Sequence, residues 1–168
     1  MSEQYSDDLL RDVLSSVKTI ALVGASANPA RPSNGVMRFL QSRGYRVIPV
    51  NPNLAGPTLN GERVYKKLAD IGEPIDMVDV FRNSEAAGAV AGEAIVISAK
   101  VLWMQLGVIN EGGAARARKA GLTVIMNRCP KIEHGRFSGE LGWMGINRKV
   151  IDNRKPLLFG KGGSLKNG

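Results

Sequence analysis

The stretch Thr19-Ile20-Ala21-Leu22-Val23-Gly24-Ala25-Ser26 decides the fold. Its first five residues form a short, mainly apolar run, which is typical of a strand buried on both faces of a parallel sheet. Gly24 ends the run, and the small residues after it allow a tight turn. The segment therefore predicts the first strand of an α/β protein and the turn that leads into its first crossover helix.

Strand and helix patterns alternate along the chain after this segment. Short apolar runs predict four further strands, at residues 46–50, 75–81, 101–104 and 122–126. Apolar residues at helical spacing predict an N-terminal helix capped by Ser6 and helices at 34–43, around 65–71, at 84–98 and at 110–120. Helices between successive strands imply right-handed crossovers. The expected fold is α/β: a Rossmann-like, doubly wound, mainly five-stranded parallel sheet with helices on both faces, in a single domain.

The domain organisation follows from this pattern and from the distribution of charge. We expect an N-terminal helix at residues 1–17, the Rossmann-like domain at 18–137 and a C-terminal extension at 138–168. Residues 148–168 hold six basic residues and one acidic residue, so this segment carries +5 of the net charge of +8. The extension is therefore expected to be basic and partly flexible rather than part of a nucleic-acid-binding face. A tail that binds an acidic partner is the alternative.

Composition and cysteine content indicate the compartment. No apolar run approaches the roughly 20 residues that a membrane-spanning helix needs. The first residues are acidic and lack the basic-then-apolar order of a secretory signal. A single cysteine cannot form an internal disulfide, so nothing points to an oxidising compartment. We expect a cytoplasmic protein.

The residues that follow the predicted strands indicate the kind of ligand. In an open parallel sheet, ligands bind beyond the carboxyl ends of the strands. All five ends carry small, amide, basic or proline residues and no carboxylate, at residues 24–33, 51–53, 81–84, 105–107 and 127–130. This lining suits an anionic ligand.

The first turn offers several groups to a phosphate. Small residues at Gly24, Ala25 and Ser26 let a phosphate approach backbone N–H groups, and the following helix adds the positive end of its dipole. The Ser26 hydroxyl can donate a hydrogen bond, and Arg31 can pair with the phosphate directly. The alternative is that Gly24 only permits a tight turn and that Ser33 only caps a helix.

A dinucleotide-binding site fits the sequence less well. The G-x-G-x-x-G fingerprint is missing, because the next glycine after Gly24 is Gly35. The second strand ends in Asn51-Pro52-Asn53 rather than in the acidic residue that holds the ribose of NAD. NADP does not need that acid, so an NADP-dependent oxidoreductase stays open as an alternative.

Several of these segments resemble a known family, the small stand-alone CoA-binding proteins related to the CoA-binding domain of succinyl-CoA synthetase α-subunits. The similar stretches span about residues 10–137 and lie at 23–26, 31–36, 49–52, 80–82, 102–107 and 127–131. The resemblance implies a Rossmann-type fold and a site for coenzyme A at the strand ends. It assigns the pyrophosphate to the first turn, the nucleotide to the end of the second strand, and the adenine or pantetheine region to the end of the third. The cofactor-binding residues so implied are Gly24, Ala25, Ser26, Arg31, Pro32, Ser33, Asn51, Pro52, Phe81, Arg82, Gln105, Gly107 and Asn127.

No catalytic residue and no metal site is predicted. His134 is the only histidine and matches no phosphohistidine loop, so we expect a surface or packing role. Cys129 and His134 are too few to hold zinc, which needs three or four protein ligands. Cys129 is expected to be an inert buried residue, with a mixed disulfide to coenzyme A as the alternative. Core packing is expected for Trp103 and Met104, and a structural or helix-capping role for Asp76 and Asp79.

The sequence thus predicts a protein that binds coenzyme A or an acyl-CoA without catalysis, as a carrier or sensor. The alternatives are an NADP-dependent oxidoreductase, a CoA-ligase component that acts with a separate subunit, and an interaction module that uses the basic tail. The expected partner is the small molecule, with no membrane or nucleic acid. A homo-oligomer or a separate protein partner stays open.

Overall fold

The structure is a computed structural model that describes residues 4–54 and 56–141. Its contacts divide the described chain into two compact units. One unit holds Val17–Cys129, and the other combines Tyr5–Ser16 with the helix that begins at Pro130. In the described part of the chain, no helix is long and apolar enough to cross a membrane.

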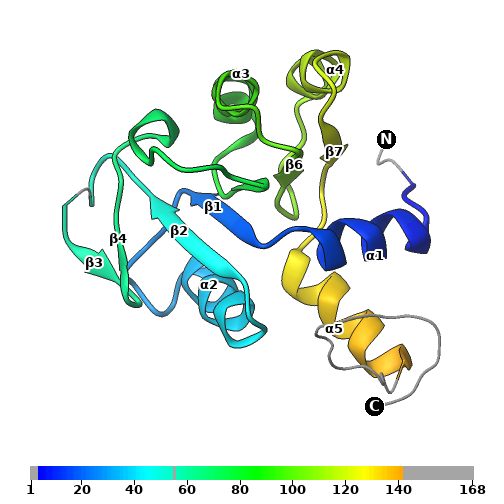
Figure 1. Cartoon of the computed structure of the whole chain (residues 1–168), viewed down its shortest axis with the longest axis horizontal. Helices are drawn as coiled ribbons and strands as arrows, with labels where there is room; N and C mark the ends of the chain where they lie inside the picture. Colours follow the sequence, from blue (N-terminus) through cyan, green and yellow to red (C-terminus); the bar gives the residue numbers. More distant parts are fainter. Residues whose placement is uncertain (1–3, 55, 142–168) are drawn as a thin grey trace. The chain divides into compact units, whose positions relative to one another are not determined.

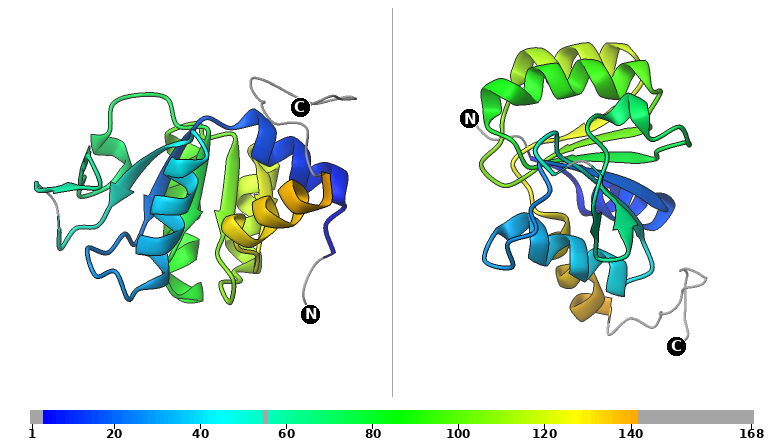
Figure 2. Two further views of the ribbon diagram at one scale, coloured as in Figure 1. Left: turned by 90° about the horizontal axis from the view of Figure 1, so that it is seen from below. Right: turned by 90° about the vertical axis from the view of Figure 1, so that its left-hand side faces the viewer.

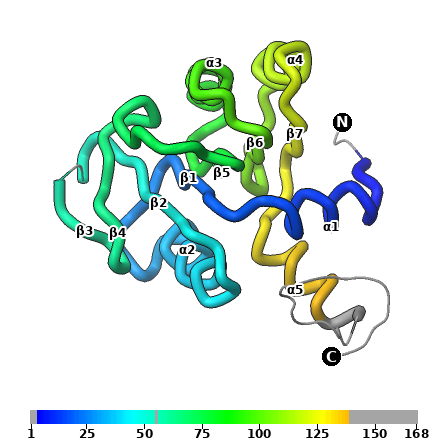
Figure 3. Tube along the Cα trace, in the orientation of Figure 1, coloured from blue at the N-terminus to red at the C-terminus, as the bar shows by residue number. Residues whose placement is uncertain are grey.

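The first unit is built on a five-stranded parallel sheet with the strand order β2-β1-β5-β6-β7 (Figure 3). The strands are β1 (Thr19–Val23), β2 (Arg46–Val50), β5 (Met77–Val80), β6 (Val101–Met104) and β7 (Thr123–Ile125). From β1 the chain first moves outward to β2 and then returns to place β5 on the other side of β1. The order therefore reverses between β1 and β5, which is the switch point of a doubly wound sheet.

Helices cover both faces of this sheet (Figures 1 and 2). Helix α2 (Pro32–Ser42) lies on one face, while α3 (Ser84–Val96) and α4 (Glu111–Lys119) lie side by side on the other. Since strand side chains alternate between the faces, both rows of a buried strand must be apolar. Four of the five residues of β1 are buried accordingly. The predicted fold is confirmed: the sheet and its helices form a single Rossmann-like α/β domain.

Several local elements differ from the sequence-based prediction. Helix α2 begins at Pro32 rather than at residue 34, because proline is well suited to the first helical position, where no N–H donor is needed. The residues between β2 and β5 form a short hairpin, β3 (Thr58–Leu59) with β4 (Glu62–Arg63), which was not predicted. The short helix expected around 65–71 is one 3₁₀ turn, η1 (Leu68–Asp70).

The second unit pairs two helices, α1 (Asp7–Ser16) and α5 (Pro130–Leu141). Ser6 caps α1 as predicted, because its hydroxyl accepts a hydrogen bond of 3.1 Å from the N–H of Leu9. Arg136 on α5 forms ion pairs with Asp7 on α1 and with Glu133. Helix α5 was not predicted, and it contains the expected boundary at residues 137 and 138. The rest of the predicted extension lies outside the described residues.

Candidate functional site

Residues just after the strand ends lie in a common row across the carboxyl edge of the sheet. The register pairs Val23 with both Val50 and Val80, and it pairs Val80 with Met104. Asn127 lies two residues past the end of β7 and joins this edge through its hydrogen bond from the N–H of Gly107, after β6. We call the following five residues the strand-end row, in spatial order: Asn51, Gly24, Phe81, Gln105 and Asn127. All five were predicted from sequence as site residues.

A cavity of about 380 Å³ opens in this row, between the ends of β1 and β5. Its lining consists entirely of predicted site residues: Gly24, Ala25, Ser26, Arg31, Pro32, Ser33, Asn51, Phe81 and Arg82. The cavity lies at the point where the strand order reverses, which is where open α/β sheets bind ligands. We call it the switch-point cavity. The other four predicted residues, Pro52, Gln105, Gly107 and Asn127, do not line it.

Gly24 shapes the cavity because no other residue fits its position. Its backbone has φ +96°, a conformation that L side chains rarely adopt. A Cβ atom at this position would stand 2.3 Å from the carbonyl oxygen of Phe81. The end of β1 therefore passes directly against the end of β5, and only glycine permits that approach.

Two buried or half-buried amide side chains hold the first turn in place. Asn51 donates from Nδ2 to the carbonyl of Ala25 at 2.7 Å, and its Oδ1 accepts from the N–H of Asn53 at 2.8 Å. Asn34 donates from Nδ2 to the carbonyl of Ser26 at 2.8 Å. Asn51 thus positions the turn and has both ends of its carboxamide engaged. Asn34 was not among the predicted site residues, although a buried asparagine in the first turn of a helix is a signal for such a role.

The backbone N–H groups of the turn are arranged differently from the prediction. Those of Gly24 and Ala25 both donate to the carbonyl of Val50, at 2.9 and 3.3 Å, so they are not free for a phosphate. Within the described chain, the N–H groups of Ser26 and Ser33 have no hydrogen-bond acceptor. The small residues at positions 24 and 25 serve the close packing of the turn, and the unpaired donors lie just beyond them.

The amino end of helix α2 faces the cavity, since Pro32 and Ser33 form part of the lining. No side chain caps this end, because the N-cap residue Arg31 makes no capping hydrogen bond. An uncapped helix start presents N–H donors and the positive end of the helix dipole. These features together favour a negatively charged group in the cavity.

The charged side chains of the lining are both basic. Arg31 and Arg82 are exposed and have neither an ion pair nor a hydrogen bond to any described side chain. Among the residues that the structure describes, no aspartate or glutamate lines the cavity. Two guanidinium groups without partners, facing a cavity that has no acid, can pair with phosphate groups in the bidentate manner that arginine favours.

Asp79 lies within β5, two residues before Phe81, level with Leu22 on one side and Trp103 on the other. Its side chain is fully buried, and neither carboxyl oxygen has a hydrogen-bond partner within the described residues. Burial raises the pKa of this carboxyl well above its ordinary value. Of the two roles expected for Asp79, structural or helix-capping, the second is excluded, since the group makes no hydrogen bond to any described residue.

Asp76, at the other end of β5, has the structural role expected of it. Burial alone would raise its pKa, but hydrogen bonds from the N–H groups of Lys18 and Thr19 and the ion pair with Lys100 lower it below its ordinary value. These bonds tie the start of β1 to the start of β5.

The ends of β6 and β7 are joined by a hydrogen bond. The N–H of Gly107 donates to Asn127 Oδ1 at 2.7 Å, and Asn127 itself has a left-handed backbone with φ +61°. Trp103 and Met104 are fully buried, as predicted for core residues. Cys129 is buried and free, and His134, in the second unit, contacts Ser138. No cluster of three possible metal ligands occurs in the part of the chain that the structure describes.

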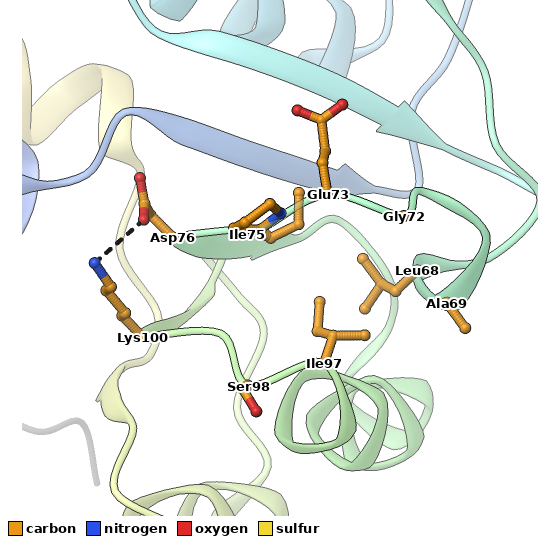
Figure 4. A pocket seen from close by; sticks show the side chains of 10 residues that line it. Leu68, Ala69, Gly72, Glu73, Ile75, Asp76, Ile97, Ser98 and Lys100 are labelled. Atoms are coloured by element: carbon orange, nitrogen blue, oxygen red, sulfur yellow. Dashed lines mark ion pairs between the residues drawn. The ribbon is translucent and has the colours of Figure 1, made fainter.

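A larger hollow, of about 460 Å³, lies at the opposite end of the sheet (Figure 4). Its apolar floor is formed by Leu68, Ile75 and Ile97. Its charged groups are already paired, Glu73 with Arg46 and Asp76 with Lys100. This hollow has no uncompensated charge to offer, so the smaller switch-point cavity is the better candidate for an anionic ligand.

A family model described as "CoA binding domain" matches residues 18–135. The chain belongs to the CoA binding domain family. Over 125 residues it is 39% identical to YneT of Bacillus subtilis (strain 168), which covers 74% of this chain and 91% of YneT. A solved structure of a protein from Pyrococcus horikoshii OT3 is 37% identical, with a TM-score of 0.77 over 83% of this chain and 100% of that one.

This CoA binding domain is also similar to part of a longer protein. A structure of the dinucleotide-forming acetyl-coenzyme A synthetase 1 from Ca. Korarchaeum cryptofilum, in complex with phosphate and ADP, is 25% identical. The match covers 73% of this chain and 28% of the synthetase, with a TM-score of 0.59. The resemblance inferred from the sequence is thus confirmed at the level of family and fold.

Proposed function

We propose that this CoA binding domain binds coenzyme A or an acyl-CoA in the switch-point cavity. The observation that carries the proposal is that Arg31 and Arg82 line a cavity to which the described residues contribute no carboxylate, and that neither guanidinium group has an ion-pair partner among those residues. Coenzyme A carries a pyrophosphate and a 3′-phosphate, so its charge is concentrated at the nucleotide end. Family membership supports this ligand over other polyanions.

The groups that line or support the cavity have different roles in binding coenzyme A. Arg31 and Arg82 attract and pair with phosphate oxygens. The unpaired N–H groups of Ser26 and Ser33 donate hydrogen bonds from fixed backbone positions, and the start of helix α2 adds its dipole. Asn34 and Asn51 hold the turn in the shape that presents these donors.

We infer that binding itself is the function, as a carrier or a sensor of the cofactor. The groups around the cavity supply positive charge, hydrogen-bond donors and shape. These properties hold and orient a ligand, and they also let the protein respond to its concentration, because a ligand that binds only the native state stabilises that state.

Isothermal titration calorimetry with coenzyme A, dephospho-coenzyme A and NADP tests the proposal. We expect binding of coenzyme A, and no binding of NADP. The variants Arg31→Gln and Arg82→Gln should each weaken coenzyme A binding by about ten- to hundredfold, since a charge-assisted hydrogen bond contributes about 1.5–3 kcal/mol. Arg38→Gln is the matched control: Arg38 is exposed on α2 and does not line the cavity, so its affinity for coenzyme A should stay that of the wild type. Binding of NADP alone would instead support an oxidoreductase.

A second candidate function is that of a component of an acyl-CoA synthetase. The observation that favours it is the similarity to 28% of the acetyl-coenzyme A synthetase chain. The purified protein can be incubated with acetate, coenzyme A and ATP, and acetyl-CoA measured. A carrier or sensor adds no acetyl-CoA in any mixture. A synthetase component should raise acetyl-CoA formation above that of a cell extract alone when the extract supplies the remaining subunit, and product formation by the protein alone would establish a complete enzyme.

A further inference from the structure

Asp79 is a buried ionisable side chain that the proposed site leaves without a role. It lies within β5, the middle strand of the sheet, and it is 0% exposed. Neither of its carboxyl oxygens has a hydrogen-bond partner among the described residues. Burying a carboxyl group in this way is costly, and the cost is far larger when the group is ionised. A charge on Asp79 would also act on its surroundings with little screening by water.

The side chain of Asp79 points to the face of the sheet that α2 covers (Figure 1). Val78 and Val80 belong to the apolar core that includes α3 and α4, and successive strand side chains point to opposite faces. Asp79 therefore shares the α2 face with Phe81, which lies two residues further along and lines the switch-point cavity. With a rise of about 3.3 Å per residue, the two positions are about 7 Å apart. A charge on Asp79 would thus act at short range on a phosphate in the cavity.

Within the first unit, no described charged side chain is paired with Asp79. Its neighbours on β1 and β6, Leu22 and Trp103, are uncharged and fully buried, and these two strands hold no ionisable residue. An ionised Asp79 would attract the two cations of the cavity lining, Arg31 and Arg82, and would compete for them with an anionic ligand. The charged side chains of α2 and α3, the helices on the two faces of β5, are exposed at the surface: Arg38, Glu85 and Glu93.

We propose that Asp79 makes coenzyme A binding depend on pH, because the neutral acid permits binding and the ionised acid repels the phosphates of the ligand. The inference rests on the proposed coenzyme A site and adds its regulation. Burial raises the pKa of Asp79, and a bound polyanion raises it further. Affinity is therefore highest below the pKa of the free protein and falls as pH rises through it. Between the pKa values of the free and the bound protein, binding takes up a proton.

Calorimetric titrations with coenzyme A from about pH 6 to about pH 9 compare the wild type with Asp79→Asn, which is neutral throughout. The phosphates and thiol of coenzyme A titrate equally in both experiments, so the ratio of the two affinities is the readout. At the acidic end the two proteins should bind equally. At the alkaline end the wild type should bind roughly tenfold more weakly, the effect of one charge about 10 Å away at an effective dielectric constant of about 20.

Asp76→Asn is the matched control. Asp76 lies at the other end of the same strand, outside the lining of the switch-point cavity, and hydrogen bonds and the ion pair with Lys100 keep its pKa low. It stays ionised over the whole range, so the ratio of the affinities of this variant and the wild type should not change with pH.

A second measurement needs only the wild type and so does not depend on the folding of Asp79→Asn. At the pH where its affinity falls, the heat of binding measured in buffers of different ionisation enthalpy should show net proton uptake. The same pH dependence in the wild type and Asp79→Asn would overturn the inference, as would the absence of proton uptake at every pH. If the wild type bound no coenzyme A at any pH, the proposed function itself would fail, so the two failures are distinguishable.

Discussion

Replacing Gly24 by alanine tests the tight contact between the ends of β1 and β5. The new Cβ would stand 2.3 Å from the carbonyl oxygen and 2.9 Å from the carbonyl carbon of Phe81. Both atoms belong to the backbone of a buried sheet, so they cannot move away as a flexible side chain could. The substitution also forces an L residue into a backbone with φ +96°.

Gly44 supplies a control that separates these two effects. It has nearly the same backbone angle, φ +95°, and a Cβ there would meet no heavy atom within 4 Å. The left-handed conformation alone costs about 1–2 kcal/mol for an L residue, which is the expected effect of Gly44→Ala. Overpacking adds about 1–3 kcal/mol, so Gly24→Ala should lose about 2–5 kcal/mol of unfolding free energy.

Urea unfolding of the wild type and both variants measures the difference. Each kcal/mol corresponds to about 2–4 °C in the midpoint of thermal unfolding for a chain of this size, which gives an independent check. Gly24→Ala should also lose coenzyme A binding, because the first turn must shift. A loss of stability no larger than that of Gly44→Ala would refute the close contact of Gly24 with Phe81.

For three further substitutions, the direction of the change in stability or in coenzyme A affinity can be predicted. Asp79→Asn should change how the free energy of unfolding depends on pH. Because the pKa of Asp79 is raised in the folded state, the unfolded chain releases this proton near pH 4 while the folded chain keeps it. The wild type therefore loses stability as pH rises above about 4. Urea unfolding from pH 3 to 8 should therefore show the variant gaining on the wild type with rising pH, and parallel curves would contradict the buried neutral acid. Asp76→Asn should act in the opposite direction, because a lowered pKa stabilises the folded state above about pH 4 and that contribution disappears as pH falls. The variant should be less stable at pH 7 and should approach the wild type near pH 3; equal stability at pH 7 would contradict the role of its hydrogen bonds. Ser26→Asp should set a negative charge against the phosphates and weaken coenzyme A binding while the midpoint of the free protein changes by only a few degrees, and undiminished binding in calorimetry would mean that Ser26 lies outside the site.

The sheet could be predicted from sequence because its strands are buried on both faces. Such strands have short apolar sequences, and the run that ends at Val23 is the clearest example. The hairpin at residues 58–63 was missed because strands of two residues are too short to show a period. Helix α5 was missed because its apolar pattern is weak: Ile132 is exposed on it, and Gly135 lowers its helix propensity.

The site could be predicted in outline because parallel strands end at the same edge of a sheet. Residues one or two positions past the strands therefore join a single row, whatever the strand order. The sequence could not predict which hydrogen-bonding groups at this edge are free to bind a ligand. The N–H groups of Gly24 and Ala25 are engaged by Val50, and that bond depends on the pairing of β1 with β2. The side-chain oxygen of Gln105, which is buried without a hydrogen-bond partner among the described residues, likewise depends on neighbours distant in sequence.

Hydrogen–deuterium exchange of the intact protein, with and without coenzyme A, tests most directly that the ligand binds at the carboxyl edge of the sheet. The two cavities lie at opposite ends of the strands, so their peptides are separate in sequence. We predict slower exchange at residues 24–33, 51–53 and 81–84 in the presence of coenzyme A, with no change at 68–76 and 97–100. Protection confined to residues 68–76 and 97–100, or no protection anywhere at saturating coenzyme A, would contradict the account.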